Sequence, residues 1–143
     1  MTLRYPDEHA MAGIIADARD YANRSAAYTH DYAGWDDQYK KHERIMWGRI
    51  GQGWLRVVCA LNDIPFEDDP SDHTESDTCD LVIDGQRIDV KTWKANGVPY
   101  QVNAALQQHP VDYYCFIGSR TNDVERPHIV PYGFIDFATF WDQ

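Results

Sequence analysis

The sequence predicts an α/β protein of the mixed, α+β kind, in which helices flank a single mixed sheet. Three observations support this fold class. The first 62 residues contain two stretches whose apolar residues recur at helical spacing. Residues 81–93 contain two apolar runs joined by Asp84-Gly85, a strong hairpin signal. A further apolar run at 111–117, VDYYCFI, predicts a buried strand.

Two long helices are expected first. Pro6-Asp7-Glu8 is typical of a helix start and predicts a helix over about residues 7–28. Asp36 can cap a second helix over about residues 36–62. Its apolar stripe runs at steps of three and four through Met46, Trp47, Ile50, Trp54, Val57, Val58 and Leu61.

Three glycines interrupt this second helical stretch, at Gly48, Gly51 and Gly53. Each weakens a helix by up to ~1 kcal/mol, so they indicate either close packing or a local break.

The remaining chain predicts mostly strands. In order we expect a short strand (63–68), the hairpin (81–83 and 86–93), a loop (94–99), a short helix (100–108), a buried strand (111–117), an edge strand interrupted by Pro131 (128–133) and a final helical turn or two (134–141). The residues expected in the core include Trp47, Trp54, Cys59, Tyr113, Cys115, Phe116 and the aromatic group at 134–141.

Composition narrows the class of protein. A chain of 143 residues suggests one domain, and its net charge of −10 argues against a basic protein that coats nucleic acid. Eight acids and no Lys or Arg lie between Phe66 and Asp84, which predicts a solvated acidic loop for most of that segment. No apolar run approaches the ~20 residues of a membrane span, so we expect a cytoplasmic protein without a membrane partner, in the host cytoplasm if it is viral.

The hairpin places charged residues opposite one another. If its loop is the two residues Asp84-Gly85, then Asp80 lies opposite Asp89, with Cβ atoms roughly 5 Å apart. Such a pair of like charges is destabilising unless something binds between them, and the hard oxygen ligands suit Mg²⁺ or Mn²⁺. Because side chains alternate along a strand, Lys91 shares the face of Asp89, whereas Ile88 and Val90 point to the core.

The second helix offers a third acid. At 100° per residue Glu43 lies on the inward apolar stripe, where it is either a metal ligand or a partly solvated residue near the helix start. Gln52 lies on the opposite face and is neutral, but its position after Gly48 and Gly51 keeps it open as the helix residue of the site.

Asp80, eight intervening residues and then Asp89-Val90-Lys91 resemble the motif of the PD-(D/E)XK nuclease superfamily. The segments 81–83 and 88–91 resemble its second and third core strands, and the helix with Glu43 resembles its first core helix. The stretch VPYQVNAALQQHPVDYYCFI resembles the helix and strand that follow the lysine in phage and restriction-type members. One departure is Cys79, where the family usually has proline.

The resemblance implies a restriction-endonuclease-like αβββαβ core with an extra N-terminal helix. It divides a single nuclease-like domain, 1–143, into an N-terminal helical extension (1–35), the core (36–120) and a C-terminal strand and helix (121–143). It also implies a metal-dependent deoxyribonuclease from a phage or mobile element, acting on DNA rather than RNA. A homodimer would suit a protein that cuts duplexes.

The resemblance also implies residue roles. Asp80, Asp89, the Val90 carbonyl and Glu43 would hold Mg²⁺ or Mn²⁺, and Lys91 would position or deprotonate the attacking water. Residues expected to contact nucleic acid are Lys40, Lys41, Arg44, Trp93, Lys94 and Gln107, with Arg120 as a further phosphate contact. The alternative function is a catalytically inactive protein on the same fold, which binds a protein partner through its acidic segment.

Overall fold

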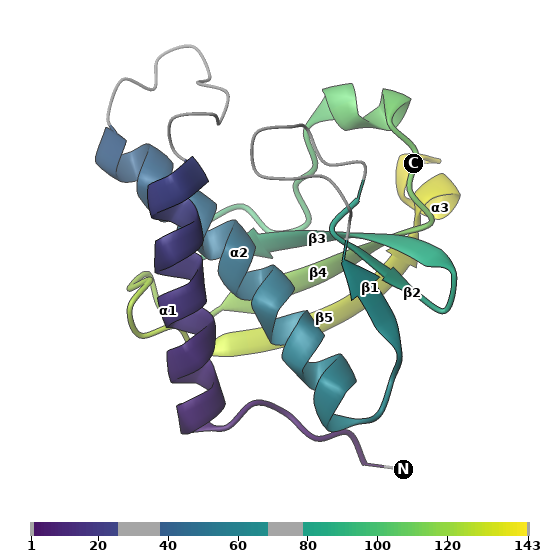
Figure 1. Cartoon of the computed structure of the whole chain (residues 1–143). Helices are drawn as coiled ribbons and strands as arrows, with labels where there is room; N and C mark the ends of the chain where they lie inside the picture. Colours follow the sequence, from purple (N-terminus) through teal and green to yellow (C-terminus); the bar gives the residue numbers. More distant parts are fainter. Residues whose placement is uncertain (1, 26–37, 69–78, 143) are drawn as a thin grey trace.

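The computed structural model describes residues 2–25, 38–68 and 79–142, together with the side chains of these ranges except residues 38–40 (Figure 1). The elements are α1 (Glu8–Ser25), α2 (Gln38–Leu61), β1 (Phe66–Asp68), β2 (Leu81–Ile83), β3 (Gln86–Trp93), the 3₁₀ helix η1 (Ala104–Gln108), β4 (Tyr113–Ser119), β5 (Ile129–Asp136) and α3 (Phe137–Trp141). The predicted order of helices and strands is confirmed for these ranges. The expected cap at Asp36 and most of the acidic loop, 69–78, lie outside the described residues.

The strands form one mixed sheet in the order β1-β2-β3-β4-β5. β3 and β4 are parallel, and the other neighbouring pairs are antiparallel. Because two parallel strands need a crossover connection, the chain passes from β3 through η1 before it enters β4. The mixed α+β class predicted from the sequence is therefore confirmed.

The β2–β3 hairpin has the two-residue loop that the sequence predicts. Ile83 pairs with Gln86, and both loop residues have positive φ, 50° at Asp84 and 75° at Gly85. Positive φ at both central positions is the requirement of a type I′ turn, which Asp-Gly meets at low cost. This local turn fixes the register of the whole hairpin.

Both long helices lie on one side of the sheet, α2 directly against it and α1 alongside α2 (Figure 1). α2 contributes Trp54, Leu55, Val58 and Cys59 to a core whose sheet residues are Leu81, Ile88, Val90, Cys115 and Ile117. Along β3, the core residues Ile88 and Val90 alternate with Asp89 and Lys91. The side chains of Asp89 and Lys91 therefore lie on the opposite face of the sheet.

Two of the three glycines of α2, Gly51 and Gly53, allow close packing. A Cβ on Gly51 would lie 2.0 Å from Thr92 Oγ1 on β3, and one on Gly53 would lie 3.1 Å from Ile14 on α1. A Cβ on Gly48 would meet nothing within 4 Å. The helix is continuous through all three, so the local break that the sequence left open does not occur.

The opposite face of the sheet carries an aromatic core. Tyr114 and Phe116 of β4 are buried there, with Trp93 and the α3 residues Phe137, Phe140 and Trp141 packed around them. Asp136 caps α3, because its carboxylate accepts a hydrogen bond from Thr139 N at 2.8 Å.

Several expectations about burial need correction. Tyr113 is 37% exposed because it lies at the first position of β4, and Phe134 is 54% exposed because its strand, β5, is an edge of the sheet. Leu61, at the last position of α2, is 38% exposed. The helix expected over 100–108 is a shorter 3₁₀ helix that begins at Ala104. The expected burial of Cys59 and Cys115 is confirmed. Within the described ranges, no helix combines the length and apolarity of a membrane span.

The close approach of α2 to β3 can be tested by adding one methyl group. Gly51→Ala should lower the free energy of unfolding by roughly 1–3 kcal/mol, because the new Cβ overlaps Thr92 Oγ1. The matched control is Gly48→Ala, which should raise it by up to about 1 kcal/mol, since its Cβ meets open space in the same helix. Chemical denaturation measures both values, and equal effects of the two variants would contradict the proposed packing.

Candidate active site

The two predicted carboxylates lie where β2 begins beside β3. Leu81 pairs with Ile88, and Asp80, the residue just before β2, donates from its N to Ile88 O at 2.9 Å. The carboxyl group of Asp80 lies close enough to that of Asp89 to share a hydrogen bond with it. The two-residue turn predicts this proximity, but the regular pairing ends at Leu81 and Ile88, so Asp80 is not the direct strand partner of Asp89. β3 continues past this point to Trp93, whereas β2 begins only at Leu81. The last residues of β3 therefore have no β2 residue beside them.

Asp80 is fixed by hydrogen bonds to both of its carboxylate oxygens. Val90 N donates to Asp80 Oδ2 at 2.7 Å, and Gln52 Nε2 donates to Asp80 Oδ1 at 3.0 Å. The first bond satisfies a backbone donor on the part of β3 that β2 does not cover. The second ties α2 to the hairpin, so the orientation of Asp80 depends on two separate elements, α2 and β3.

The environment of Asp80 opposes its negative charge. Burial raises the pKa of Asp80 well above its usual range, and the charge of Asp89 and a hydrogen bond with it raise this pKa further. The hydrogen bond from Val90 N and the charge of Lys91 act in the opposite direction. Lys91 Nζ lies 3.1 Å from Asp89 Oδ2, and both side chains are less than one quarter exposed. One ammonium group thus faces two acids at the edge of the buried aromatic core.

The helix residue at this cluster is Gln52. Its amide oxygen accepts from Arg49 and from Arg56, each at 3.5 Å, so its nitrogen is left to donate to Asp80. The sequence left Gln52 open but did not anticipate the two arginines. The available signal was the spacing: Arg49 and Arg56 lie three residues before and four residues after Gln52, which places them on one helix face.

Glu43 occupies a different place. It lies nine residues before Gln52, about 13 Å along the helix axis, where Trp47 Nε1 donates to it at 3.4 Å. Lys94 Nζ, just beyond β3, lies 3.9 Å from Glu43 Oε1. Glu43 is thus half-buried on the inward side of α2, as the stripe predicts, but none of its contacts among the described residues reaches Asp80 or Asp89.

The fit of this cluster to a divalent cation rests on its donor set. Among the described residues, no group of three or more Asp, Glu, His or Cys side chains is arranged around one point. Asp80 and Asp89 nevertheless supply hard oxygen ligands, and Mg²⁺ commonly keeps several waters and binds proteins through only one or two carboxylates. Their mutual repulsion, against a single Lys91, is the feature that a cation would relieve.

The structure separates the residues expected to contact nucleic acid. Lys41 is buried, at 4% exposure, which argues against the expected contact with phosphates. The side chain of Lys40 lies outside the described part of the chain. Arg44 is half-buried, Lys94 is 41% exposed beside Glu43, and Gln107 and Arg120 are exposed.

Trp93 shares the face of Lys91, as strand alternation predicts, and is half-buried against other aromatic rings. Its ring centroid lies 4.8 Å from that of Tyr132 and 5.3 Å from that of Tyr100. Sequence reasoning missed Tyr100 and Tyr132 as neighbours of this face, because they come from a loop and an edge strand that are distant in the sequence.

Tyr114, the register partner of Asp89, is fully buried beneath the cluster. Burial raises the pKa of Tyr114, and its hydroxyl accepts from Trp141 Nε1 at 3.0 Å. Tyr114 is thus packed beside Asp89 in the neighbouring strand and anchored there by Trp141.

The site was compared with known proteins at three levels. Neither protein-family models, nor curated protein sequences, nor solved structures give a match to this chain. The assignment of a function therefore depends on the geometry of Asp80, Asp89, Lys91 and Gln52.

Proposed function

We propose that this protein is a metal-dependent nuclease that hydrolyses phosphodiester bonds of DNA. The observation that carries the proposal is the close pair of carboxyl groups of Asp80 and Asp89, with Lys91 Nζ 3.1 Å from Asp89. Two half-buried carboxylates are costly to hold together, so a protein that retains them beside one lysine has a use for the charge. The resemblance of Asp80…Asp89-Val90-Lys91 to the PD-(D/E)XK motif supports the same chemistry.

The roles of the residues follow from their chemistry. Asp80, Asp89 and the Val90 carbonyl would hold Mg²⁺ or Mn²⁺, while Gln52 and Val90 N keep Asp80 in its orientation. A bound cation supplies Lewis-acid polarisation of the scissile phosphate and lowers the pKa of a water. Lys91 orients or deprotonates the attacking water, or stabilises the charge that develops on the phosphate. We assign Glu43 no direct part, because its contacts are to Trp47 and Lys94.

Removing the proposed catalytic groups should abolish cleavage without unfolding the protein. In the presence of Mn²⁺ or Mg²⁺, we expect the wild-type protein to cut DNA, Asp89→Asn to show no detectable cutting, and Lys91→Ala to be slower by roughly 10²- to 10⁴-fold. The measurement is cleavage of plasmid and of linear single- and double-stranded DNA, with EDTA as the blank. Because Asp89 and Lys91 are at the edge of the core, circular dichroism checks that both variants are folded.

The matched control for this experiment is Arg87→Ala, an exposed charge on the same hairpin that lies two residues before Asp89. It should cut at nearly the wild-type rate. Wild-type cutting by Lys91→Ala would refute the proposed mechanism, and absence of cutting by the folded wild-type protein with either metal would favour the catalytically inactive alternative.

The cation site can be tested without measuring activity. We expect Mn²⁺ to raise the melting temperature of the wild-type protein, since a ligand that binds only the folded state stabilises it, and Asp89→Asn to abolish this rise. Gln52→Glu places a third carboxylate against Asp80 and removes its hydrogen-bond donor. This variant should melt below the wild type in EDTA and gain more from Mn²⁺.

The control for the added charge is Gln107→Glu, because Gln107 is exposed on η1. Its response to Mn²⁺ should equal that of the wild type. If Mn²⁺ leaves the melting temperature unchanged in both the wild type and Gln52→Glu, then Asp80 and Asp89 do not bind the cation.

A further inference from the structure

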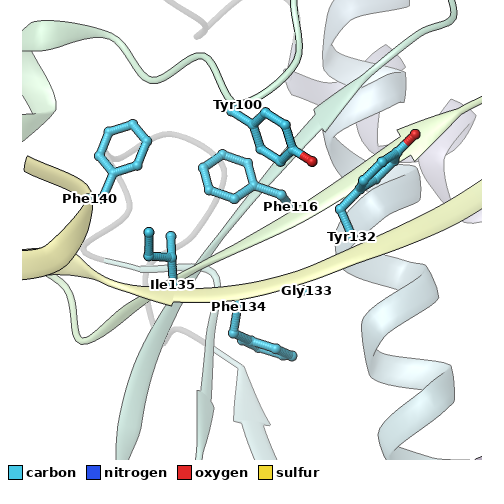
Figure 2. Close-up of a pocket in the computed structure, with 7 residues that line it drawn as sticks. All are labelled: Tyr100, Phe116, Tyr132, Gly133, Phe134, Ile135 and Phe140. Carbon is cyan, nitrogen blue, oxygen red and sulfur yellow. The ribbon is translucent and has the colours of Figure 1, made fainter. Parts of the chain in front are cut away.

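An aromatic pocket opens on the same face of the sheet as the proposed active site. Its volume is about 380 Å³, and it is lined by Tyr100, Phe116, Tyr132, Gly133, Phe134, Ile135 and Phe140 (Figure 2). We infer that this pocket binds an unpaired nucleobase of the substrate, beside the phosphate that would be cut. The inference rests on the proposed nuclease function and names its substrate class as single-stranded or frayed nucleic acid.

The pocket adjoins the active site through the register of the sheet. Phe116 of β4 is the direct partner of Lys91 of β3, and neighbouring strands lie about 4.8 Å apart. Partners in register share a face, so the ring of Phe116 lies on the side of Lys91 and Asp89. A nucleotide whose phosphate met Lys91 would therefore have its base next to the pocket.

The lining suits a flat, uncharged group. None of the residues that line the pocket is charged, so the pocket offers no cationic side chain to pair with a phosphate. Tyr100 and Tyr132 are 51% and 53% exposed, and their rings meet edge to face, with an angle of 87° between their planes. Exposed aromatic surface of this kind binds bases by stacking, which tolerates any sequence because every base has a π face.

Two backbone features hold the aromatic rings in place. Tyr100 has a φ of 57°, a conformation that is uncommon for a bulky residue, and its ring contacts those of Trp93 and Phe116. A Cβ on Gly118 would lie 2.8 Å from the Tyr132 ring and 3.0 Å from the Trp93 ring. Strained positions that surrounding contacts maintain are typical of functional sites, and here they serve the exposed rings.

An unpaired base is favoured over a duplex for a physical reason. Bases inside a duplex are stacked on their neighbours and cannot present a face to a protein ring until they leave the stack. The protein carries a net charge of −10, so attraction of the phosphate backbone alone is a weak source of affinity. Stacking on Tyr100 and Tyr132 supplies affinity that does not depend on positive charge.

The test is binding of a fluorescent single-stranded oligothymidine to the whole protein in EDTA, which prevents cleavage, measured by anisotropy. Tyr132→Ala should weaken binding by roughly 5- to 150-fold, the range for loss of one stacked base. Tyr132→Phe keeps the ring and should bind like the wild type. The same strand with abasic sites should bind the wild type more weakly, and a blunt duplex should bind less tightly than the single strand.

Tyr113→Ala is the matched control. Tyr113 is also an exposed tyrosine, at 37%, and lies on the neighbouring strand β4, but it does not line the pocket. Tyr113→Ala should bind the oligonucleotide like the wild type. Loss of binding in Tyr113→Ala equal to that in Tyr132→Ala would overturn the inference, because it would indicate a general effect of removing an exposed tyrosine from the sheet.

The outcomes separate this inference from the proposed function. Unchanged binding by Tyr132→Ala, or equal affinity for duplex and single strand, overturns the base pocket even if cleavage depends on Asp89. Binding that requires Tyr132 supports the pocket even if no metal promotes cleavage. The pocket could instead be occupied by a second copy of the chain, and size-exclusion chromatography tests this alternative. If the wild type is a dimer and Tyr132→Ala is a monomer, the rings join two copies of the chain and the inference is overturned.

Discussion

The repulsion between Asp80 and Asp89 is the constraint on which the rest of the site depends. A two-residue turn sets the hairpin register and thereby brings these carboxylates close together. The protein offsets the cost with a backbone donor from Val90, an amide donor from Gln52 and the ammonium group of Lys91. Each of these groups must be held in a particular position beside the acids, and the packing of α2 against the sheet holds all three there.

The strongest requirement falls on the contact between α2 and β3. Gln52 reaches Asp80 only because its neighbour Gly51 lets the helix approach Thr92 without a side chain between them. Arg49 and Arg56 then engage the oxygen of the Gln52 amide, which leaves its nitrogen for Asp80. The helix thus contributes a neutral donor to the acids, whereas Glu43 lies farther along the same helix with Lys94.

Local patterns predicted the hairpin, and with it the proximity of Asp80 and Asp89 although not their exact pairing, because a turn of two residues determines the register over short distances in the sequence. The order of helices and strands followed from apolar periodicity in the same way. Contacts between distant segments were harder to predict. The choice between Glu43 and Gln52 depends on how α2 rotates and slides against β3, which periodicity alone does not determine. The exposure of Tyr113 and Phe134 depends on strand ends and sheet edges, and these are set by the final topology.

The two faces of β3 have different neighbours. Ile88 and Val90 bind it to α2, and Asp89, Lys91 and Trp93 face the aromatic side. A substitution of Ile88 or Val90 therefore acts on the packing against α2, whereas one of Asp89 or Lys91 acts on the proposed site. Val90 joins the two roles, since its side chain packs in the core while its N–H holds Asp80.

The short hairpin turn also bears on the order in which the site assembles during folding. Asp80 and Asp89 are joined by a local hairpin, whereas the contact between Gln52 and Asp80 spans 28 positions in the sequence. Contacts between near neighbours close with a smaller loss of chain entropy than contacts between distant ones. The two acids can therefore meet in an early hairpin, and the amide that restrains them arrives only when α2 docks on the sheet.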